Sequence, residues 1–457
     1  MKKRSKKKAY TPGLPMVRAD AAGIDLGSRE HWVCCPQREA EQANVRQFAT
    51  TTVELKALAD WLQQEGVQTV AMESTGLYWV ALYDLLEERG LEVLLVDARQ
   101  LKRVPGRCKT DNRDCQWIQK LHSCGLLTGC FRPTGPTREL RTIVRERSNL
   151  KEEMGRVVQR MQKALDSMNV KIHHAVTDLT GVTGMSILRA IVQGERDPAQ
   201  LAQLRDRRCK KSVQQIAQHL EGTWMPEHLF TLERQLEQYE FLQQQLDQYQ
   251  RHIVQRFNEL TPVERENKPV PVHPNLQKEK DLIRRAEQEL RTALWRFSGI
   301  DLTLIPGVSV EVALTVMTEV GLNIHCFPSS KHLVSWLRIS KPLEVSAHKK
   351  SKKKGRGVGS SRIARSLRMS ALSLKRSQTY LGAFFRRKSA RKEYGVAITA
   401  TARKLAEHLY RALRHGQQYV EQGVAAYEAK YQEDRLKYAL KIAQSMGYTL
   451  VPQETAK

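Results

Sequence analysis

Between residues 18 and 130 the chain alternates short apolar runs with helix-like segments. Three short runs come first, AAGIDLG, HWVCCP and NVRQFAT, and their close spacing predicts three strands joined as hairpins. TTVELKALADWLQQEG and YWVALYDLLEERG then repeat apolar residues at the spacing of amphipathic helices, and VQTVAMES and LEVLLVD have the pattern of strands. Hairpin strands followed by alternating helices and strands predict a mixed α/β domain over residues 18–134. This order is typical of ribonuclease-H-like (RuvC-like) domains, and other mixed sheets share it.

Two longer stretches carry a seven-residue repeat of apolar positions, in which the steps alternate between four and three residues. The pattern predicts long helices that pair as an antiparallel hairpin, either within one chain or as a coiled-coil arm between subunits, over residues 135–260. The repeat positions are Ile143, Arg147 (a charged interruption), Leu150, Met154, Val157, Met161, Ala164 and Met168, and then Leu229, Leu232, Leu236, Tyr239, Leu246 and Ile253.

The rest of the chain is predicted to be helical after a proline-rich stretch. TPVERENKPVPVHPN has the composition of a linker, over residues 261–275. Beyond it, LIPGVSVEVALTVMTEVG is similar to a helix-hairpin-helix unit, in which Gly307 would let backbone N–H groups approach a phosphate. We expect a helical C-terminal domain over residues 276–430, followed by a C-terminal helix and tail over residues 431–457.

The charge balance points to a polyanionic partner. The 457 residues contain 75 Lys and Arg against 49 Asp and Glu, a formal net charge of +26. Nucleic acid is the usual partner of such an excess, and no apolar run reaches the roughly 18 residues that a membrane span needs. The basic start of the chain has no apolar stretch behind it, so residues 1–17 are interpreted as a disordered basic arm rather than a secretory signal.

Four acidic residues lie where predicted elements begin or end. Asp25 lies at the end of the first strand, Glu73 ends the strand VQTVAMES, and Asp111 and Asp114 lie three apart in KTDNRDCQW, where a helix would present both on one face. Such side chains can meet at one edge of the sheet, and divalent cations would offset their mutual repulsion. Carboxylate oxygens suit Mg²⁺ or Mn²⁺, and a pair of such ions favours in-line phosphoryl transfer.

A second group of candidate residues is basic and lies in the C-terminal region. HKKSKKKGRGVGSSRIARSLRMSALSLKR combines a Lys/Gly loop with an arginine-bearing helix, and RRKSARK follows it. Neutralisation of phosphates is the expected role, which provides affinity without reading base sequence. The predicted nucleic-acid contacts are Lys349, Lys350, Lys352, Lys353, Lys354, Arg356, Arg362, Arg365, Arg368, Arg386 and Arg387, together with Gly307.

Five segments of the chain resemble blocks of a known family. AAGIDLGS, VAMESTGLYW, VPGRCKTDNRDCQW, DLTGVTGMSILRAIVQGERDP and LGAFFRRKSARKEYG resemble segments of the DEDD-type insertion-sequence transposases of the IS110 family, recombinases guided by a bridge RNA. The blocks occur in the family's order and extend over nearly the whole chain. The resemblance implies that the family's acidic tetrad falls on Asp25, Glu73, Asp111 and Asp114, the residues already selected by their placement.

The resemblance also implies a serine nucleophile. The family's serine lies in a Ser-Gly-Gly-Lys segment about ten residues after the tryptophan of a Ser-Trp-Leu-Gly stretch. In SWLRISKPLEVSAHKK, Ser346 stands ten residues after Trp336, although Arg338 and the pair Ala347-His348 replace glycines. Ser346 is therefore the predicted nucleophile, with Ser351 as the alternative.

The implied reaction joins the two groups of residues. Metal at the tetrad would polarise a phosphodiester, Ser346 would attack it to form a phosphoserine link, and a strand of the partner duplex would then displace the serine. The implied partners are donor and target DNA, a guide RNA and further copies of the chain in a dimer of dimers. The expected location is the bacterial cytoplasm, at the nucleoid when the protein is active.

Two other functions remain open from the residues alone. A junction-resolving or structure-specific nuclease would use the same acids to hydrolyse DNA through water, and hydrolysis would survive the loss of Ser346. A non-enzymatic organiser of nucleic acid, built on basic arms and a coiled coil, would make the acidic tetrad incidental. Loss of cleavage in an Asp25→Ala variant that still binds DNA would eliminate it.

Overall fold

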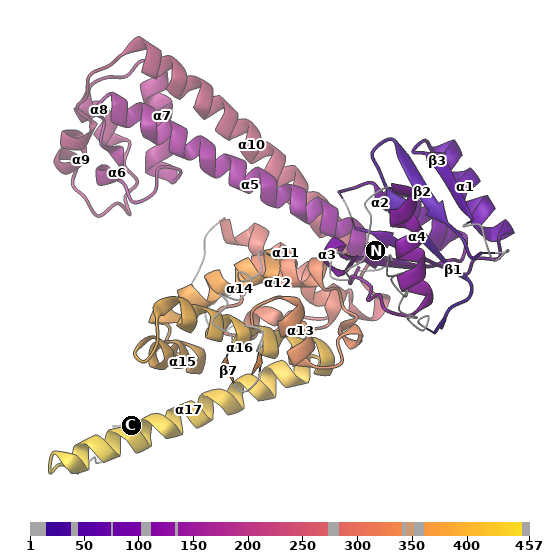
Figure 1. Ribbon diagram of the computed structural model, residues 1–457. Coiled ribbons are helices and arrows are strands. Elements are labelled where there is room, and N and C mark those ends of the chain that lie inside the picture. The colour runs from indigo at the N-terminus through magenta and orange to yellow at the C-terminus, as the bar shows by residue number, and fades with distance from the viewer. Residues whose placement is uncertain are drawn as a thin grey trace, which may run out of the picture. The chain divides into compact units, whose positions relative to one another are not determined.

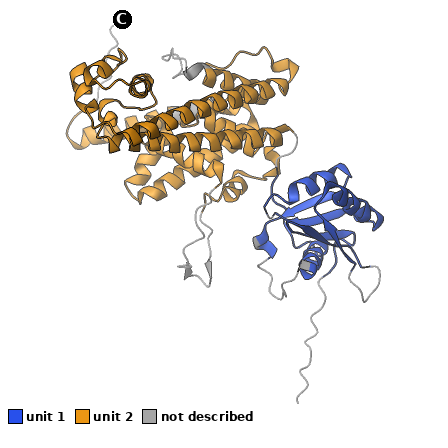
Figure 2. Ribbon diagram, turned by 90° about the horizontal axis from the view of Figure 1, so that it is seen from above, with its two compact units in different colours: residues 1–132 blue, residues 133–457 orange. Residues whose placement is uncertain are grey.

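The computed structural model divides into two compact units, residues 1–132 and 133–457, shown in Figure 2. The first unit is mixed α/β and the second is mostly helical, which confirms the prediction of an α/β domain followed by helical regions. The structure describes residues 15–37, 44–74, 76–101, 111–132, 136–272, 283–340, 345–346, 349–350 and 361–449.

The first unit is built on a five-stranded sheet with the strand order β3-β2-β1-β4-β5. The strands β1, β2 and β3 pair antiparallel, whereas β4 pairs parallel to β1 and β5 pairs parallel to β4. The elements are β1 (Ala21–Leu26), β2 (Glu30–Cys34), β3 (Val45–Ala49), α1 (Thr52–Gln64), β4 (Thr69–Glu73), α2 (Trp79–Glu88), β5 (Glu92–Val96), α3 (Ala98–Leu101) and α4 (Asp111–Ser123).

The two faces of this sheet are covered by different helices. Because side chains alternate between the faces of a strand, Ile24 and Met72 pack on one side with Leu58 of α1, in a core that α2 also joins. On the other side Ala71 packs with Ile118 of α4. Both faces of the central strands are therefore buried, which explains why the strand sequences are apolar at nearly every position.

The second unit begins with a long helical hairpin. The two repeat stretches lie on α5 (Pro136–Ser167) and α10 (Pro226–Glu259), which pack side by side within one chain (Figure 1). The charged repeat position Arg147 is buried together with its apolar neighbours. Residues 168–225 at the end of the hairpin are called the arm head here; they hold α6 (Ile172–Ala175), α7 (Val182–Val192), α8 (Pro198–Gln203) and α9 (Val213–Leu220).

A bundle of shorter helices follows the hairpin, with α16 in contact with α13, α14, α15 and α17. None of the helices in the described ranges is both long and apolar enough to cross a membrane. The helices and strands are α11 (Ile283–Ser298), α12 (Val310–Glu319), α13 (Ser330–Trp336), β6 (Val345–Ser346), β7 (Lys349–Lys350), α14 (Arg362–Ser373), α15 (Tyr380–Ser389), α16 (Tyr394–His415) and α17 (Gln417–Ser445), with short 3-10 turns η1 (Val263–Arg265), η3 (Leu302–Leu304), η4 (Ile324–Cys326) and η5 (Leu374–Arg376).

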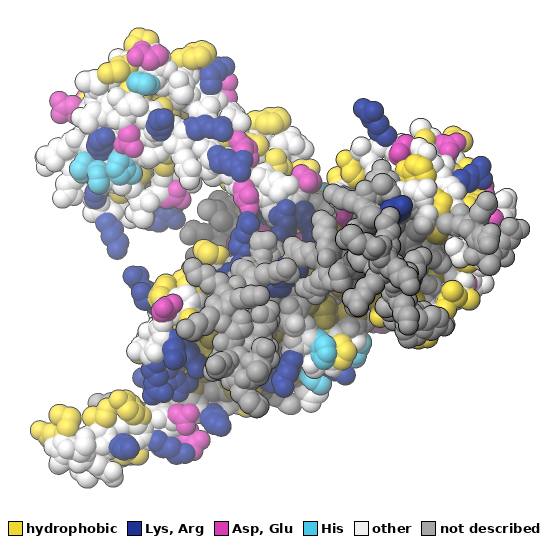
Figure 3. All heavy atoms as spheres, viewed as in Figure 1, with side chains coloured by type: hydrophobic (Ala, Val, Ile, Leu, Met, Phe, Trp, Pro, Cys, Tyr) yellow, Lys and Arg dark blue, Asp and Glu magenta, His cyan; other side chains and the backbone are white. Residues whose placement is uncertain are grey.

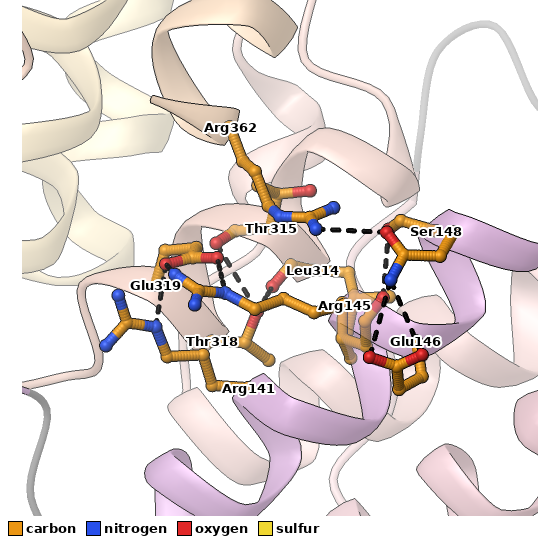
Figure 4. Close-up of polar contacts among 11 residues, drawn as sticks. Arg141, Arg145, Glu146, Ser148, Leu314, Thr315, Thr318, Glu319 and Arg362 are labelled. Carbon is orange, nitrogen blue, oxygen red and sulfur yellow. Dashed lines mark hydrogen bonds and ion pairs between the residues drawn. The ribbon is translucent and has the colours of Figure 1, made fainter. Parts of the chain in front are cut away.

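Ion pairs tie the hairpin to this bundle. Figure 4 shows Arg141 and Arg145 of α5 converging on Glu319 of α12, at N–O distances of 2.8 and 2.7 Å. Glu319 is buried, and the two guanidinium groups outweigh the effect of burial and lower the pKa of its carboxyl group. The base of the hairpin is therefore fixed to α12 by ion pairs with the buried Glu319.

A second ion-pair cluster predicts a pH dependence of stability. Glu311 of α12 accepts hydrogen bonds from Arg147 and Lys151 of α5, at 2.7 and 2.6 Å. Burial alone would raise the pKa of Glu311, but these two cations outweigh it and lower the pKa to about 2. The pKa of Glu311 is lower in the folded protein than its ordinary value near 4.5. The ion pairs therefore stabilise the fold fully when the pH is above this ordinary value, and their contribution is lost as the pH falls toward 2.

We expect Glu311→Gln to lower the free energy of unfolding at pH 7 by about 1–2 kcal/mol, a value reduced for solvent screening because the side chain is 41% exposed. Urea unfolding of the two proteins should give curves that converge between pH 4.5 and 2. A difference independent of pH would contradict the assigned ion pair.

Candidate active site

Asp25 and Glu73 lie at the carboxyl ends of neighbouring parallel strands. In the β1–β4 register, Gly23 pairs with Ala71 and Ile24 pairs with Met72. The next position along each strand is Asp25 on β1 and Glu73 on β4. The sheet therefore brings these two acids, which are 48 residues apart in sequence, to the same edge.

Contacts with α4 show which face of the sheet carries the two acids. Thr69 Oγ1 of β4 lies 2.9 Å from His122 Nε2 of α4. On β1, a Cβ added to Gly23 would lie 2.2 Å from the backbone nitrogen of Gln119. Alternate residues of a strand share a face. Asp25 therefore lies on the same face as Gly23, and Glu73 lies on the same face as Thr69. This is the face that α4 covers.

Helix α4 runs antiparallel to β1 and so begins near this edge. Its last residue, Ser123, accepts hydrogen bonds from the backbone of Val17 and Arg18, which precede β1. Asp111 and Asp114 form the first turn of α4, at the opposite end. The carboxyl ends of β1 and β4 and the first turn of α4 therefore converge.

Standard geometry supports this placement along the helix. Asp25 lies two residues beyond Gly23, about 6.6 Å along the strand. Gly23 contacts α4 at Cys115 and Gln119, so the centre of this contact lies halfway between those two residues. Measured along the helix axis from that centre, Asp114 lies about 4.5 Å and Asp111 about 9 Å toward the start of the helix. The charge of Asp25 also reaches the neighbouring thiol: burial, then Cys34 and then Asp25 raise the pKa of Cys115 to about 12.

The donor chemistry of this edge fits a divalent metal ion. Asp25, Glu73 and Asp114 supply carboxylate oxygens from separate elements, and Asp114 is only 5% exposed. All three also take part in other contacts within the protein. The side chain of Asp111 lies outside the described residues, and within the described part no three acidic, histidine or cysteine side chains are already arranged to hold an ion.

The predicted nucleophile lies in a short hairpin of the second unit. Ser346 in β6 pairs with Lys349 in β7, and Val345 pairs with Lys350. Only the backbones of β6 and β7 are described; residues 347–348 and the side chains of Ser346, Lys349 and Lys350 lie outside the described residues. The remaining candidates of this segment lie outside the described residues; they are Ser351, Lys352, Lys353, Lys354 and Arg356.

Several of the predicted arginine contacts have partners within the chain. Arg362 donates to the Asn149 side chain at 3.1 Å, and Arg365 pairs with Glu152 at 3.1 Å, so both tie α14 to α5. Arg386 donates to the backbone carbonyl of Ser377 at 2.6 Å. These contacts give the three arginines structural roles, and their contact with nucleic acid stays a prediction, as does that of the half-buried Arg368.

Two family models match the chain. Residues 22–170 match a DEDD-type IS110 model described as a transposase, and residues 299–386 match a model described as the transposase IS116/IS110/IS902 family. The chain belongs to the IS110 family of transposases. No curated protein matches it.

Family membership settles the class of activity. This IS110 transposase is an enzyme that acts on DNA, and its DEDD type implies dependence on a divalent metal ion. The first matched region contains the whole acidic tetrad. The second contains Ser346, which places the acids and the predicted nucleophile in separately recognised parts of the transposase.

Gly307 of the transposase lies in the turn that precedes α12. Its φ of +87° is favoured for glycine, and a Cβ at this position would lie 2.9 Å from the Leu374 side chain. The turn and close packing therefore require glycine. Its predicted approach to a phosphate remains a prediction.

The exposed basic residues around the end of α15 extend the predicted interface. Arg387 is exposed, as are Lys375, Arg376, Arg391 and Lys392 in the same part of the chain. Figure 3 shows a cluster of Lys and Arg side chains over this end of the bundle. The run RRKSARK is the sequence signal for part of this group.

Gly23 is a positioning residue that the sequence analysis did not select. A Cβ there would lie 2.2 Å from Gln119 N and 2.6 Å from Cys115 O, both backbone atoms that no side-chain rotation can move. Gly23 thereby sets how closely α4 approaches β1. A period of two along the strand puts Gly23 on the same face as Asp25, which is the signal that was available.

We expect Gly23→Ala to displace α4 and to destabilise the first unit by about 3 kcal/mol or more, because the overlap is with backbone. Hydrogen exchange of the α4 amides should become faster, and DNA cleavage should fall with it. Gly155→Ala is the matched control, since nothing lies within 4 Å of a Cβ at that helical position. Unchanged α4 protection in Gly23→Ala would contradict the close packing.

Proposed function

We propose that the protein cuts and rejoins DNA strands of donor and target duplexes through a covalent phosphoserine intermediate. The observation that carries the proposal is the convergence of Asp25, Glu73 and the first turn of α4 on one edge and face of the sheet. The strand order, with three antiparallel strands followed by two parallel ones, supports a ribonuclease-H-like (RuvC-like) domain. Acids at the strand ends of such a sheet suit phosphoryl transfer.

In the proposed reaction the Ser346 hydroxyl oxygen forms a bond to phosphorus, and the P–O bond to one sugar oxygen breaks. The leaving sugar oxygen takes up a proton. A sugar hydroxyl of the partner duplex then attacks the same phosphorus, and Ser346 leaves and is reprotonated. The covalent link to serine keeps the energy of the broken phosphodiester bond, so the exchange needs no nucleoside triphosphate.

Asp25, Glu73, Asp111 and Asp114 would hold Mg²⁺ or Mn²⁺ in this proposal. When bound, such an ion would offset the developing negative charge on the phosphate. The carboxylates themselves would hold this ion beside the scissile phosphate. The exposed basic residues near the end of α15 would hold the DNA backbone.

A trapping experiment tests the covalent step. The full chain would be incubated with Mg²⁺ and a nicked DNA substrate whose cleaved end diffuses away, so that rejoining is blocked. We expect a protein–DNA adduct whose phosphoserine maps by mass spectrometry to Ser346. Cleaved DNA without an adduct would instead support a metal-dependent nuclease that uses water.

Guidance by RNA and assembly into a dimer of dimers rest on the resemblance to the family. The excess of positive charge, +26, suits a complex that carries several nucleic-acid strands. Purifying the chain from its native host and sequencing the RNA that accompanies it tests the guide. A recurrent short RNA encoded beside the gene is the expected result, and random fragments would contradict it.

A further inference from the structure

The arm head carries a basic pocket that the proposed strand exchange does not use. A cavity of about 590 Å³ opens between α6, the start of α7 and the loop of residues 205–211. Its lining includes His173, His174, Lys210 and Lys211. The cavity lies wholly within the second unit and outside the serine hairpin and the bundle helices.

Positive charge exceeds negative charge around this pocket, and the acids are already engaged. Asp178 accepts hydrogen bonds from the backbone and hydroxyl of Thr180, and Asp206 accepts from Arg208 at 2.8 Å. Asp166 faces Lys171 and His173, at 3.5 and 3.6 Å. Residues 166–183 and 205–211 contain six cations and three acids; the cations are Lys171, Arg205, Arg207, Arg208, Lys210 and Lys211, and the acids are Asp166, Asp178 and Asp206.

Three histidine rings gather beside these cations. The ring centroids of His173 and His174 are 4.2 Å apart, and those of His174 and His219 are 5.7 Å apart. Burial, and then the charges of Lys211, His174 and His173, lower the pKa of His219. Figure 3 shows a histidine patch bordered by Lys and Arg on the arm head. Like charges crowd here, and a bound anion would relieve their repulsion.

The pocket is held in shape by hydrogen bonds of the chain itself. Arg205 donates to the backbone carbonyl of Lys211 at 2.7 Å, and the backbone N–H of Asp206 donates to Thr183 Oγ1 at 2.9 Å. The Lys211 ammonium donates to the carbonyl of His174. The loop is therefore fixed against α6 and α7, while Arg207, Lys210, His173 and His174 are exposed.

We propose that the arm head binds an unpaired polynucleotide strand. Its phosphates would lie against Lys210, which lines the pocket, and against the exposed Arg207 of the same loop, and its bases would stack on the rings of His173 and His174. Cations neutralise the phosphates of any nucleic acid, but imidazole rings can stack only on bases whose faces are open. Bases within a duplex are stacked on each other, so this combination fits a single strand better than a double one. Single-stranded RNA and DNA share this chemistry.

Photo-crosslinking of the full chain tests the proposal. The probes are a short RNA carrying 4-thiouridine, the corresponding DNA carrying 4-thiothymidine, and each strand within a duplex. Mass spectrometry of the adducts should locate single-strand crosslinks in residues 171–183 and 205–211. Crosslinks absent from these segments, or equally abundant with duplex probes, would overturn the proposal.

Charge variants show whether the cations bind the strand. We expect Arg207→Gln/Lys210→Gln to reduce crosslinking at the arm head about tenfold. The slope of log affinity against log salt at this site should become shallower by about 1.4, because each phosphate contact contributes about 0.7. The matched control is Arg156→Gln/Arg160→Gln, which removes two exposed charges from α5 and should leave both values unchanged.

Ring variants separate stacking from charge, and thermal unfolding of each variant checks that it folds. His173→Ala/His174→Ala should lower the crosslink yield and leave the salt dependence unchanged; an unchanged yield would refute the stacking contact. A preference for the RNA probe would identify a transcript as the source of the strand. Equal yields with DNA would extend the site to any unpaired strand. Both results support the proposal.

Discussion

Replacing Asp25 with asparagine is expected to reduce metal-dependent DNA cleavage by about a thousandfold or more. Asparagine keeps the shape of the side chain and removes the charge that would hold a divalent ion beside Glu73 and the first turn of α4. Stabilisation of the transferring phosphate by such an ion contributes several kcal/mol, which corresponds to a rate change of this size. The measurement is single-turnover cleavage of labelled donor DNA in Mg²⁺, with DNA binding measured in parallel.

The sheet itself offers a matched control for this variant. Glu30 begins β2, next to the end of β1, but its carboxylate accepts hydrogen bonds from Trp32 Nε1 at 3.0 Å and from Gln47. In Glu30→Gln the remaining oxygen can still accept from Trp32, and the new amide group can donate to the Gln47 oxygen once the Gln47 amide turns over, so cleavage should be retained. Equal activity of Asp25→Asn and the wild type would show that the sheet edge with Asp25, Glu73 and the first turn of α4 is not the active site.

Ser346→Ala is expected to abolish the protein–DNA adduct and the rejoining of strands. Alanine has no oxygen to bond to phosphorus, so the loss should be complete within the sensitivity of the gel. The exposed basic residues near the end of α15 are unchanged in this variant, so DNA binding should persist. The assay follows adduct formation and recombinant product from labelled donor and target duplexes.

Ser351→Ala is the companion variant, because it removes the same atom five residues further along. It should form the adduct at the wild-type level. If Ser351→Ala loses the adduct and Ser346→Ala retains it, the nucleophile is Ser351. If both retain cleavage and neither wild type nor variant forms an adduct, water is the attacking group.

The sequence predicted the first unit well because its pattern is local. Apolar runs in AAGIDLG and VQTVAMES define β1 and β4, and turns place Asp25 and Glu73 directly at their ends. The family matches confirm the resemblance seen in the motifs. The direction of α4 and its contact with Gly23 were not predictable in this way, because they depend on packing between segments nearly a hundred residues apart.

Charge was less informative than pattern. Arg362 and Arg365 have the composition of a DNA-binding helix, yet their partners Asn149 and Glu152 lie more than two hundred residues earlier. A net charge records only the excess of cations and not which of them are already paired. For the same reason the pocket of the arm head could not be predicted from composition, because its cations line a cavity only when residues 205–211 fold against α6 and α7.

The paired helices α5 and α10 also act as a spacer of defined length. The 34 residues of α10 span about 51 Å at 1.5 Å per residue, which equals the axial length of roughly fifteen base pairs. Deleting seven residues from each helix would keep the apolar repeat in phase and shorten the hairpin by about 10 Å. The distance that the transposase can span along a bound nucleic acid would thus change in steps of seven residues, about 10 Å each.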